Sequence, residues 1–187
     1  LHPQPTPKDA TLFAFSFSPN KTGNYQLWAD VTPLSKNTTQ PARQQFVQAR
    51  LSALNPASNP IDTTLVDEAT LGSLKAKLSF DPPLQSDQAS IGTVTVTNLA
   101  GQPIRNLEPV LGAFAHVVAY ANNGQSILHS HPMGKEPKGA ADRAGPTLQF
   151  HLEPSQSGFV KIFVQIRLDG RDLIFPFGVM VPDKAKD

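Results

Sequence analysis

The chain has 187 residues, 39% of them hydrophobic and 17% charged, so it is long enough and apolar enough to bury a core. Its formal net charge of +1 comes from interspersed charges of both signs, which argues against a nucleic-acid-binding stripe and a patch for anionic membranes. The absence of cysteine excludes disulfides and thiolate metal sites, and no run approaches the roughly 20 apolar residues of a membrane-spanning helix.

Nine stretches are predicted to be β-strands because they are rich in Phe, Val, Ile and Thr and are bounded by turn residues. In chain order they cover residues 11–18, 23–31, 73–80, 91–98, 110–121, 126–131, 147–153, 159–168 and 172–181. Two further stretches, 43–54 and 65–77, could each contain a short helix. Evenly spaced strands without interleaved amphipathic helices predict an all-β, immunoglobulin-like antiparallel β-sandwich.

A partial repeat relates the N-terminal part of the chain to the C-terminal part. Both segments carry a phenylalanine, a proline, a glycine and a large aromatic residue at the same offsets: Phe15, Pro19, Gly23 and Trp28, and Phe150, Pro154, Gly158 and Phe163. We therefore expect residues 1–55 to be the C-terminal strands of a duplicated domain, 56–71 a linker, and 72–187 a complete β-sandwich domain. The strands of the first copy need a partner, which could be the second domain, a swapped strand in a homodimer, or another segment.

Histidines gather on one predicted hairpin. If Asn123-Gly124 forms a two-residue type I′ turn, His116 lies directly opposite His131, and Val118 lies opposite His129. Strand side chains alternate between faces, so the three imidazoles share one face, with opposite β-carbons about 4.5–5.5 Å apart. Three converging imidazoles are a plausible ligand set for zinc or copper.

Two more residues extend this predicted ligand set. His151 lies on the next strand and is expected to be a fourth ligand or a support for the others. Met133 continues the alternation of His129 and His131, and its thioether would favour copper, Cu(I) in particular. The competing interpretation is a structural or protein-interaction module whose histidines only form hydrogen bonds, possibly a strand-swapped dimer without metal.

The histidines belong to a wider pattern that resembles a loosely described group of bacterial secreted or periplasmic β-sandwich domains, mostly uncharacterised. The residues that carry the resemblance lie within about 72–181, with an echo at 1–33, and include Leu111-Gly112, His116, His129, His131-Pro132, Phe150, Pro154 and Gly158. The resemblance implies export to the periplasm or the medium and a histidine-lined site. The sequence begins at Leu1 rather than Met, which is expected where an initiator or an export signal has been removed or the chain trimmed.

Motifs of known catalytic chemistry are missing from the sequence. It contains no nucleophile elbow, no glycine-rich phosphate loop, no zinc-protease helix motif and no EF-hand loop. The carboxylates are scattered, and Glu153 alone lies near the histidines in sequence. These observations favour a non-enzymatic metal-binding protein of the cell envelope, for copper or zinc, over an enzyme.

Overall fold

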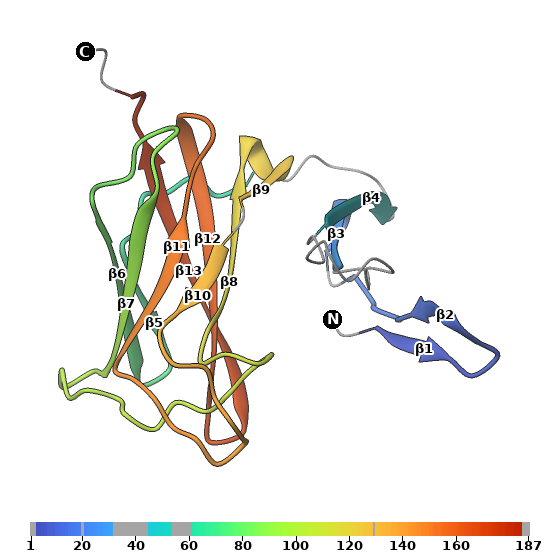
Figure 1. Ribbon diagram of the computed structural model, residues 1–187. Helices are drawn as coiled ribbons and strands as arrows, with labels where there is room; N and C mark the ends of the chain where they lie inside the picture. The colour runs from blue at the N-terminus through green and yellow to red at the C-terminus, as the bar shows by residue number, and fades with distance from the viewer. Residues whose placement is uncertain (1–2, 20, 32–44, 54–60, 129, 185–187) are drawn as a thin grey trace, which may run out of the picture. The chain divides into compact units, whose positions relative to one another are not determined.

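The computed structural model describes residues 3–19, 21–31, 45–53, 61–128 and 130–184, which fall into two compact units. The first unit spans residues 1–60 and the second 61–187 (Figure 1). Within the described residues, the helical content is a single 3-10 turn at Asn122–Gly124, and no helix is long and apolar enough to cross a membrane. The prediction of an all-β chain is confirmed.

The N-terminal unit consists of two antiparallel hairpins. Strand β1 (Gln4–Thr6) pairs with β2 (Asp9–Ala14), and β3 (Gly23–Val31) pairs with β4 (Gln45–Ala53). The predicted strand 23–31 is confirmed, whereas the short helix considered for 43–54 is wrong. Pairing with β3 along its whole length overrides the helix propensity of the glutamine, alanine and arginine residues in β4.

The second unit is a sandwich of two antiparallel sheets. One sheet has five strands in the order β10-β11-β7-β6-β5, and the other has four in the order β13-β12-β8-β9. The strands are β5 (Glu68–Leu71), β6 (Leu74–Asp81), β7 (Ser90–Asn98), β8 (His116–Ala121), β9 (Ser126–Leu128), β10 (Ser130–Met133), β11 (Thr147–Leu152), β12 (Gly158–Leu168) and β13 (Arg171–Val181). The predicted antiparallel β-sandwich is therefore present in this unit.

The second unit begins before residue 72. Strand β5 lies inside the segment 56–71 that the sequence assigns to a linker, and it pairs with β6, so the helix considered for 65–77 is also wrong. Ahead of β5, Val66 exchanges two backbone hydrogen bonds with Gly178 of β13, at 2.8 and 2.9 Å. The carboxylate of Asp62 accepts a hydrogen bond from Nζ of Lys161 on β12 at 3.1 Å. These contacts attach residues 62–66 to strands β12 and β13 of the four-stranded sheet.

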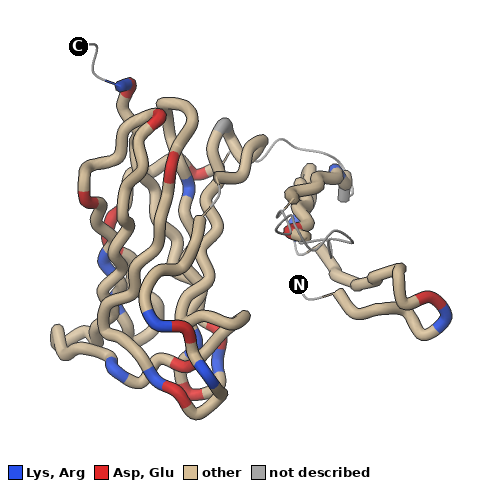
Figure 2. The backbone as a smooth tube through the Cα atoms, in the orientation of Figure 1, with Lys and Arg blue, Asp and Glu red and all other residues tan. Residues whose placement is uncertain are grey.

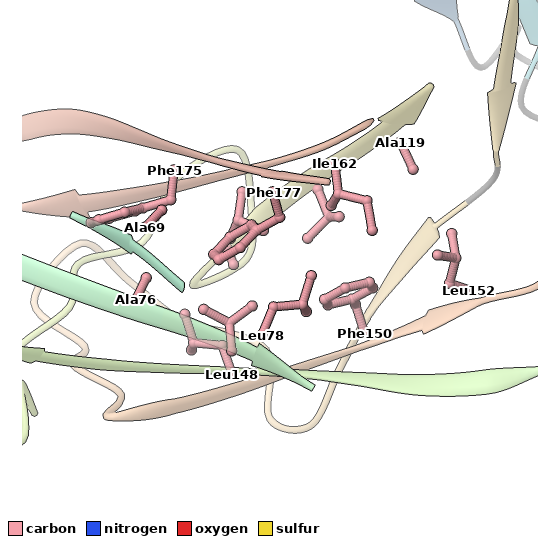
Figure 3. Close-up of a cluster of buried hydrophobic side chains, with 14 of the residues drawn as sticks. Ala69, Ala76, Leu78, Ala119, Leu148, Phe150, Leu152, Ile162, Phe175 and Phe177 are labelled. Carbon is pink, nitrogen blue, oxygen red and sulfur yellow. The ribbon is translucent and has the colours of Figure 1, made fainter. Parts of the chain in front are cut away.

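Alternation of side chains along each strand builds the core between the two sheets. On β12 the residues Val160, Ile162, Val164 and Ile166 are buried, while the residues between them are only partly covered. Phe150 of β11 and Phe175 and Phe177 of β13 are the largest fully enclosed side chains, and they lie in the interior shown in Figure 3. In a two-layer sandwich, every second side chain of a strand points into the core, so each strand needs one apolar face.

Charged residues lie on the outside of this core. Lysines, arginines, aspartates and glutamates alternate along the loops and strand ends of the described chain (Figure 2). Arg167 and Asp172, opposite each other on β12 and β13, form a bidentate ion pair with distances of 2.6 and 3.0 Å. The mixture of signs agrees with the interspersed charges of the sequence.

Candidate functional site

The turn that orients the histidine hairpin has the predicted geometry. Asn123 has φ 54° and ψ 39° and Gly124 has φ 80°, so both central residues have the positive φ that a type I′ turn requires. The predicted register is confirmed for the three residue pairs next to the turn, Ala121↔Ser126, Tyr120↔Ile127 and Ala119↔Leu128.

The hairpin then ends, and the predicted pairing of His116 with His131 is wrong. Strand β9 stops at Leu128, and from Ser130 the chain continues as β10 in the other sheet. His116 lies opposite Gln165 of β12 instead. The second strand of the hairpin therefore contributes to both layers of the sandwich, a crossing that local turn geometry does not reveal.

Proline explains why β10 lies where it does. Pro132 has no N–H group to donate, so it is tolerated in a strand only where one side of the strand has no neighbour. Strand β10 is the edge strand of the five-stranded sheet, with β11 as its hydrogen-bonded neighbour. Met133 is the last residue of β10, so Pro132 does not end the strand.

The structure pairs His131 with His151 across β10 and β11. Directly opposite residues of antiparallel strands have β-carbons about 4.5–5.5 Å apart, which is close enough for two imidazoles to share an ion. Both histidines lie on the outer face of the sheet, because Phe150 and Leu152 on either side of His151 are buried. His131 is exposed and His151 is half-buried.

Met133 lies on the same outer face, two residues after His131 and opposite Gln149. Its side chain is 44% exposed, so its thioether is accessible. The amide Nε2 of Gln149 is 3.4 Å from Oγ1 of Thr93 on β7, and this contact directs Gln149 away from β10. Two predicted ligands, with Met133 beside them, thus come together on one exposed surface, which we call the histidine pair.

The remaining predicted ligands do not join the histidine pair in the described chain. His116 lies on the outer face of the four-stranded sheet, since its neighbours Val117 and Ala119 point into the core. His116 therefore belongs to a different sheet from His131 and His151. His129 lies outside the described residues. Among the residues described, no group of three or more histidine, aspartate or glutamate side chains is arranged to hold a metal ion.

A cavity of about 640 Å³ adjoins the histidine pair. His131 and Met133 line one side of it, and residues 111–115, 134–136, 142–144 and 147–149 complete its wall. Sequence reasoning missed this cavity because its lining comes from four segments that only the folded sandwich brings together. Its charged lining residues are Lys135, Glu136, Asp142 and Arg143.

Hydrogen bonds order the loop that carries these charges. Oδ2 of Asp142 accepts the backbone N–H groups of Lys138, at 2.6 Å, and of Gly139, at 3.3 Å. Nη1 of Arg143 donates to the carbonyl oxygens of Ala140 and Asp142, each at 2.9 Å. The carboxylate of Asp142 and the guanidinium of Arg143 therefore shape the cavity wall by holding the backbone of this loop.

A strained turn forms the rim of the cavity. Leu111 and Gly112 have φ values of 53° and 82°, and Val110 and Ala113 exchange backbone hydrogen bonds of 2.7 and 3.1 Å across them. This is a type I′ geometry, which is unfavourable for a leucine. The predicted strand 110–121 consequently begins only at His116, and the Leu-Gly pair of the sequence pattern is a tight turn beside the cavity.

Comparisons with known proteins leave the chemistry of this surface open. No curated protein matches the chain. A family model does match residues 69–183, a range that runs from the second residue of β5 to beyond β13, includes the histidine pair and the cavity, and leaves out the N-terminal unit. Since the match covers more than half of the sequence, the chain belongs to the family described as a domain of unknown function (DUF8832).

Proposed function

We propose that this protein is a non-catalytic metal-binding protein of the cell envelope, which holds one copper or zinc ion at the histidine pair. The observation that carries the proposal is the register of β10 and β11, which sets His131 and His151 directly opposite each other on an exposed face. The location rests on the resemblance to secreted and periplasmic domains described above.

The donor set favours copper over zinc. Zinc in a structural site is four-coordinate, with nitrogen, sulfur or carboxylate ligands, and the histidine pair supplies two imidazoles. Cu(I) accepts imidazole and the soft thioether sulfur of methionine, which Met133 presents two residues from His131 on the same face. A site of two imidazoles and one thioether on a solvent-accessible edge suits binding and release of copper.

The histidines that remain have different places in the proposal. His129 is retained as a further donor because it precedes His131 by two residues in the sequence. His116 is given no role at this site, because its strand belongs to the other sheet and its side chain lies on the outer face of that sheet. His116 therefore serves as an internal control, because it is also a histidine but lies on the other sheet.

Competition for Cu(I) against a chromogenic chelator tests the proposal. We expect one equivalent of Cu(I) to bind, and the His131→Ala and His151→Ala variants to lose more than about 100-fold in affinity, beyond the 10–100-fold typical for residues that only support a ligand. Met133→Leu should weaken Cu(I) binding and leave Zn²⁺ binding unchanged, because zinc does not select thioethers.

His116→Ala is the matched control, and it should bind Cu(I) as the wild-type protein does. Affinity should also fall as the pH is lowered, since protons compete with the metal for the imidazole nitrogens. The proposal is overturned if no metal binds more tightly than micromolar, or if His116→Ala loses as much affinity as His131→Ala.

The second candidate function is a protein-interaction module that binds no metal. One observation favours it, namely that the N-terminal unit carries large apolar side chains that are exposed, among them Phe13 at 59% and Leu12 at 58%. Exposed apolar surface of this kind marks an interaction site. The two candidates differ in whether the histidine pair binds metal, which the Cu(I) competition decides; the apolar residues belong to the first unit and the histidine pair to the second.

A further inference from the structure

The β3–β4 hairpin of the N-terminal unit has one apolar face. The register places Tyr25 opposite Leu51, Leu27 opposite Ala49, and Ala29 opposite Val47, all on the same face. Val47 is 56% exposed and Leu51 45%, so these side chains are not enclosed. A two-stranded hairpin is marginally stable alone, and in a sandwich its apolar face would pack against the apolar face of a second sheet.

The other face of this hairpin is mixed in character: Gln26, Trp28 and Phe46 are half-buried, and Nε1 of Trp28 is enclosed. Nε2 of Gln26 donates to Oε1 of Gln48 at 2.8 Å, and Oγ of Ser52 donates to Oδ1 of Asn24 at 2.9 Å. Its other positions are Asp30, Arg50, Trp28 and Phe46, the last two being the apolar exceptions. The polar groups of this face bond to each other across the strands, whereas the exposed apolar side chains of the opposite face mark that face as the one for a partner.

Aromatic residues at and after β2 add to the same uncovered surface. Phe13 is 59% exposed and Phe15 45%, and Phe17 contacts Tyr25 of β3 edge to face with ring centroids 6.0 Å apart. In the described residues of this unit, Gly23 alone is buried. The contact between Phe17 and Tyr25 joins the segment after β2 to the apolar face of β3.

The same pattern occurs in the complete domain, where these positions are enclosed. When Gly23 is aligned with Gly158, each of which opens a strand with positive φ (135° and 122°), the apolar residues of the first unit fall on core positions of the second. The residues Phe13, Phe15, Phe17, Tyr25 and Leu27 correspond to Leu148, Phe150, Leu152, Val160 and Ile162, all of them buried. The described part of the N-terminal unit therefore repeats the apolar pattern of β11 and β12 without the strands that flank them in the complete domain, β7 and β8.

The topology of the complete domain shows how two four-strand halves combine into one sandwich. The domain contains two successive pairs of hairpins, β6–β7 followed by β8–β9, and β10–β11 followed by β12–β13. Each half thus has four strands. The second strand of one half pairs with the second strand of the other (β7 with β11), and the third pairs with the third (β8 with β12), both antiparallel. The two halves are therefore related by an approximate two-fold axis, and equivalent strands pair across it.

We propose that the N-terminal unit dimerises with the same unit of a second copy of this chain and so completes a second β-sandwich. Strand β2 would pair antiparallel with β2 of the partner, and β3 with β3, giving sheets ordered β1-β2-β2-β1 and β4-β3-β3-β4. In the described residues β2 and β3 each have a hydrogen-bonded neighbour on one side only, so both edges are available. The two-fold symmetry makes the assembly a closed pair and covers both apolar faces, with β1 and β4 as the outer edges of the two sheets.

Light scattering coupled to size exclusion measures the association directly. At tens of micromolar the full chain should elute as one species of twice the 20.2 kDa chain mass. Phe13→Lys and Val47→Lys should each halve that mass, because both side chains are exposed in the single unit and enclosed in the dimer. Neither substitution removes a buried group from the single unit, so circular dichroism of the variants should stay that of a β protein.

Ala14→Lys is the matched control, since Ala14 neighbours Phe13 on β2 and lies on the opposite face. It should leave the dimer intact, and so should His131→Ala, which separates this inference from metal binding. A wild-type chain that stays at 20.2 kDa overturns the proposal and leaves a different occupant for the apolar face. A series of larger masses, or dimers that persist in both lysine variants, overturns it as well, because a closed two-fold pair has one mass and one interface.

Discussion

Gly92 of β7 is the position at which a single methyl group tests the core packing. It lies between Phe80 of β6 and Phe150 of β11 and pairs with both. The two phenylalanine rings meet edge to face across it, with centroids 6.0 Å apart and an interplanar angle of 86°. A Cβ atom on residue 92 would overlap the Phe150 ring, which is only 2% exposed and has no free space into which to move.

The expected cost of Gly92→Ala follows from two opposing terms. Adding a methyl group to a closely packed core costs about 1–3 kcal/mol. Replacing glycine by alanine also restricts the unfolded chain, which contributes about 0.4–1 kcal/mol in favour of folding. We therefore expect a net loss of about 1–2 kcal/mol in the free energy of unfolding, which for a chain of this size lowers the melting temperature by about 2–8 °C.

Urea unfolding of the wild-type chain and of four variants measures this cost: Gly92→Ala, Gly139→Ala, Phe150→Leu, and Phe150→Leu combined with Gly92→Ala. Gly139→Ala is the matched glycine control, because a Cβ at Gly139 meets no atom within 4 Å, and it should be neutral or stabilising. In the Phe150→Leu background the cost of Gly92→Ala should shrink, since leucine leaves room for the methyl group. If Gly92→Ala is as stable as the wild type, or costs the same with Leu at position 150, the ring does not lie over Gly92 and the reasoning is refuted.

Two further predictions concern the turn at the cavity and the segment that precedes β5. Leu111→Asn should stabilise the protein by about 1 kcal/mol, because asparagine tolerates positive φ; a lower melting temperature would show that contacts of the leucine side chain outweigh its strain. The pKa of Asp62 is lowered to about 2 by hydrogen bonds from the side chain and backbone of Thr64 and by Lys161. A lowered pKa stabilises the fold above the ordinary value of 3.8 and loses this effect as the pH falls through 2, so Asp62→Asn should lower the melting temperature at pH 7 and match the wild type near pH 2. A difference that does not change with pH would contradict that assignment.

Local sequence determined much of the strand pattern and its turns. The strand 23–31 matches β3, and the alternation of apolar residues in β7, β12 and β13 is enough to identify one buried face. Asn123-Gly124 specifies its turn because few residue pairs adopt positive φ at both positions. The turn then fixes the register of the three neighbouring residue pairs of β8 and β9. These features depend on residues within a few positions of each other, which is why they can be predicted.

Tertiary structure decided where the histidines lie. From Asn123-Gly124 alone, the hairpin register continues to His131 and sets it opposite His116, and nothing local indicates that the strand changes sheets after Leu128. That change depends on the edge of the five-stranded sheet, where β11 offers its hydrogen-bonding groups and an edge position accommodates Pro132. The His131–His151 pair and the adjoining cavity exist only because segments distant in sequence meet at that edge. The free energy of such contacts depends on the whole fold rather than on neighbouring residues, so a local pattern does not predict them.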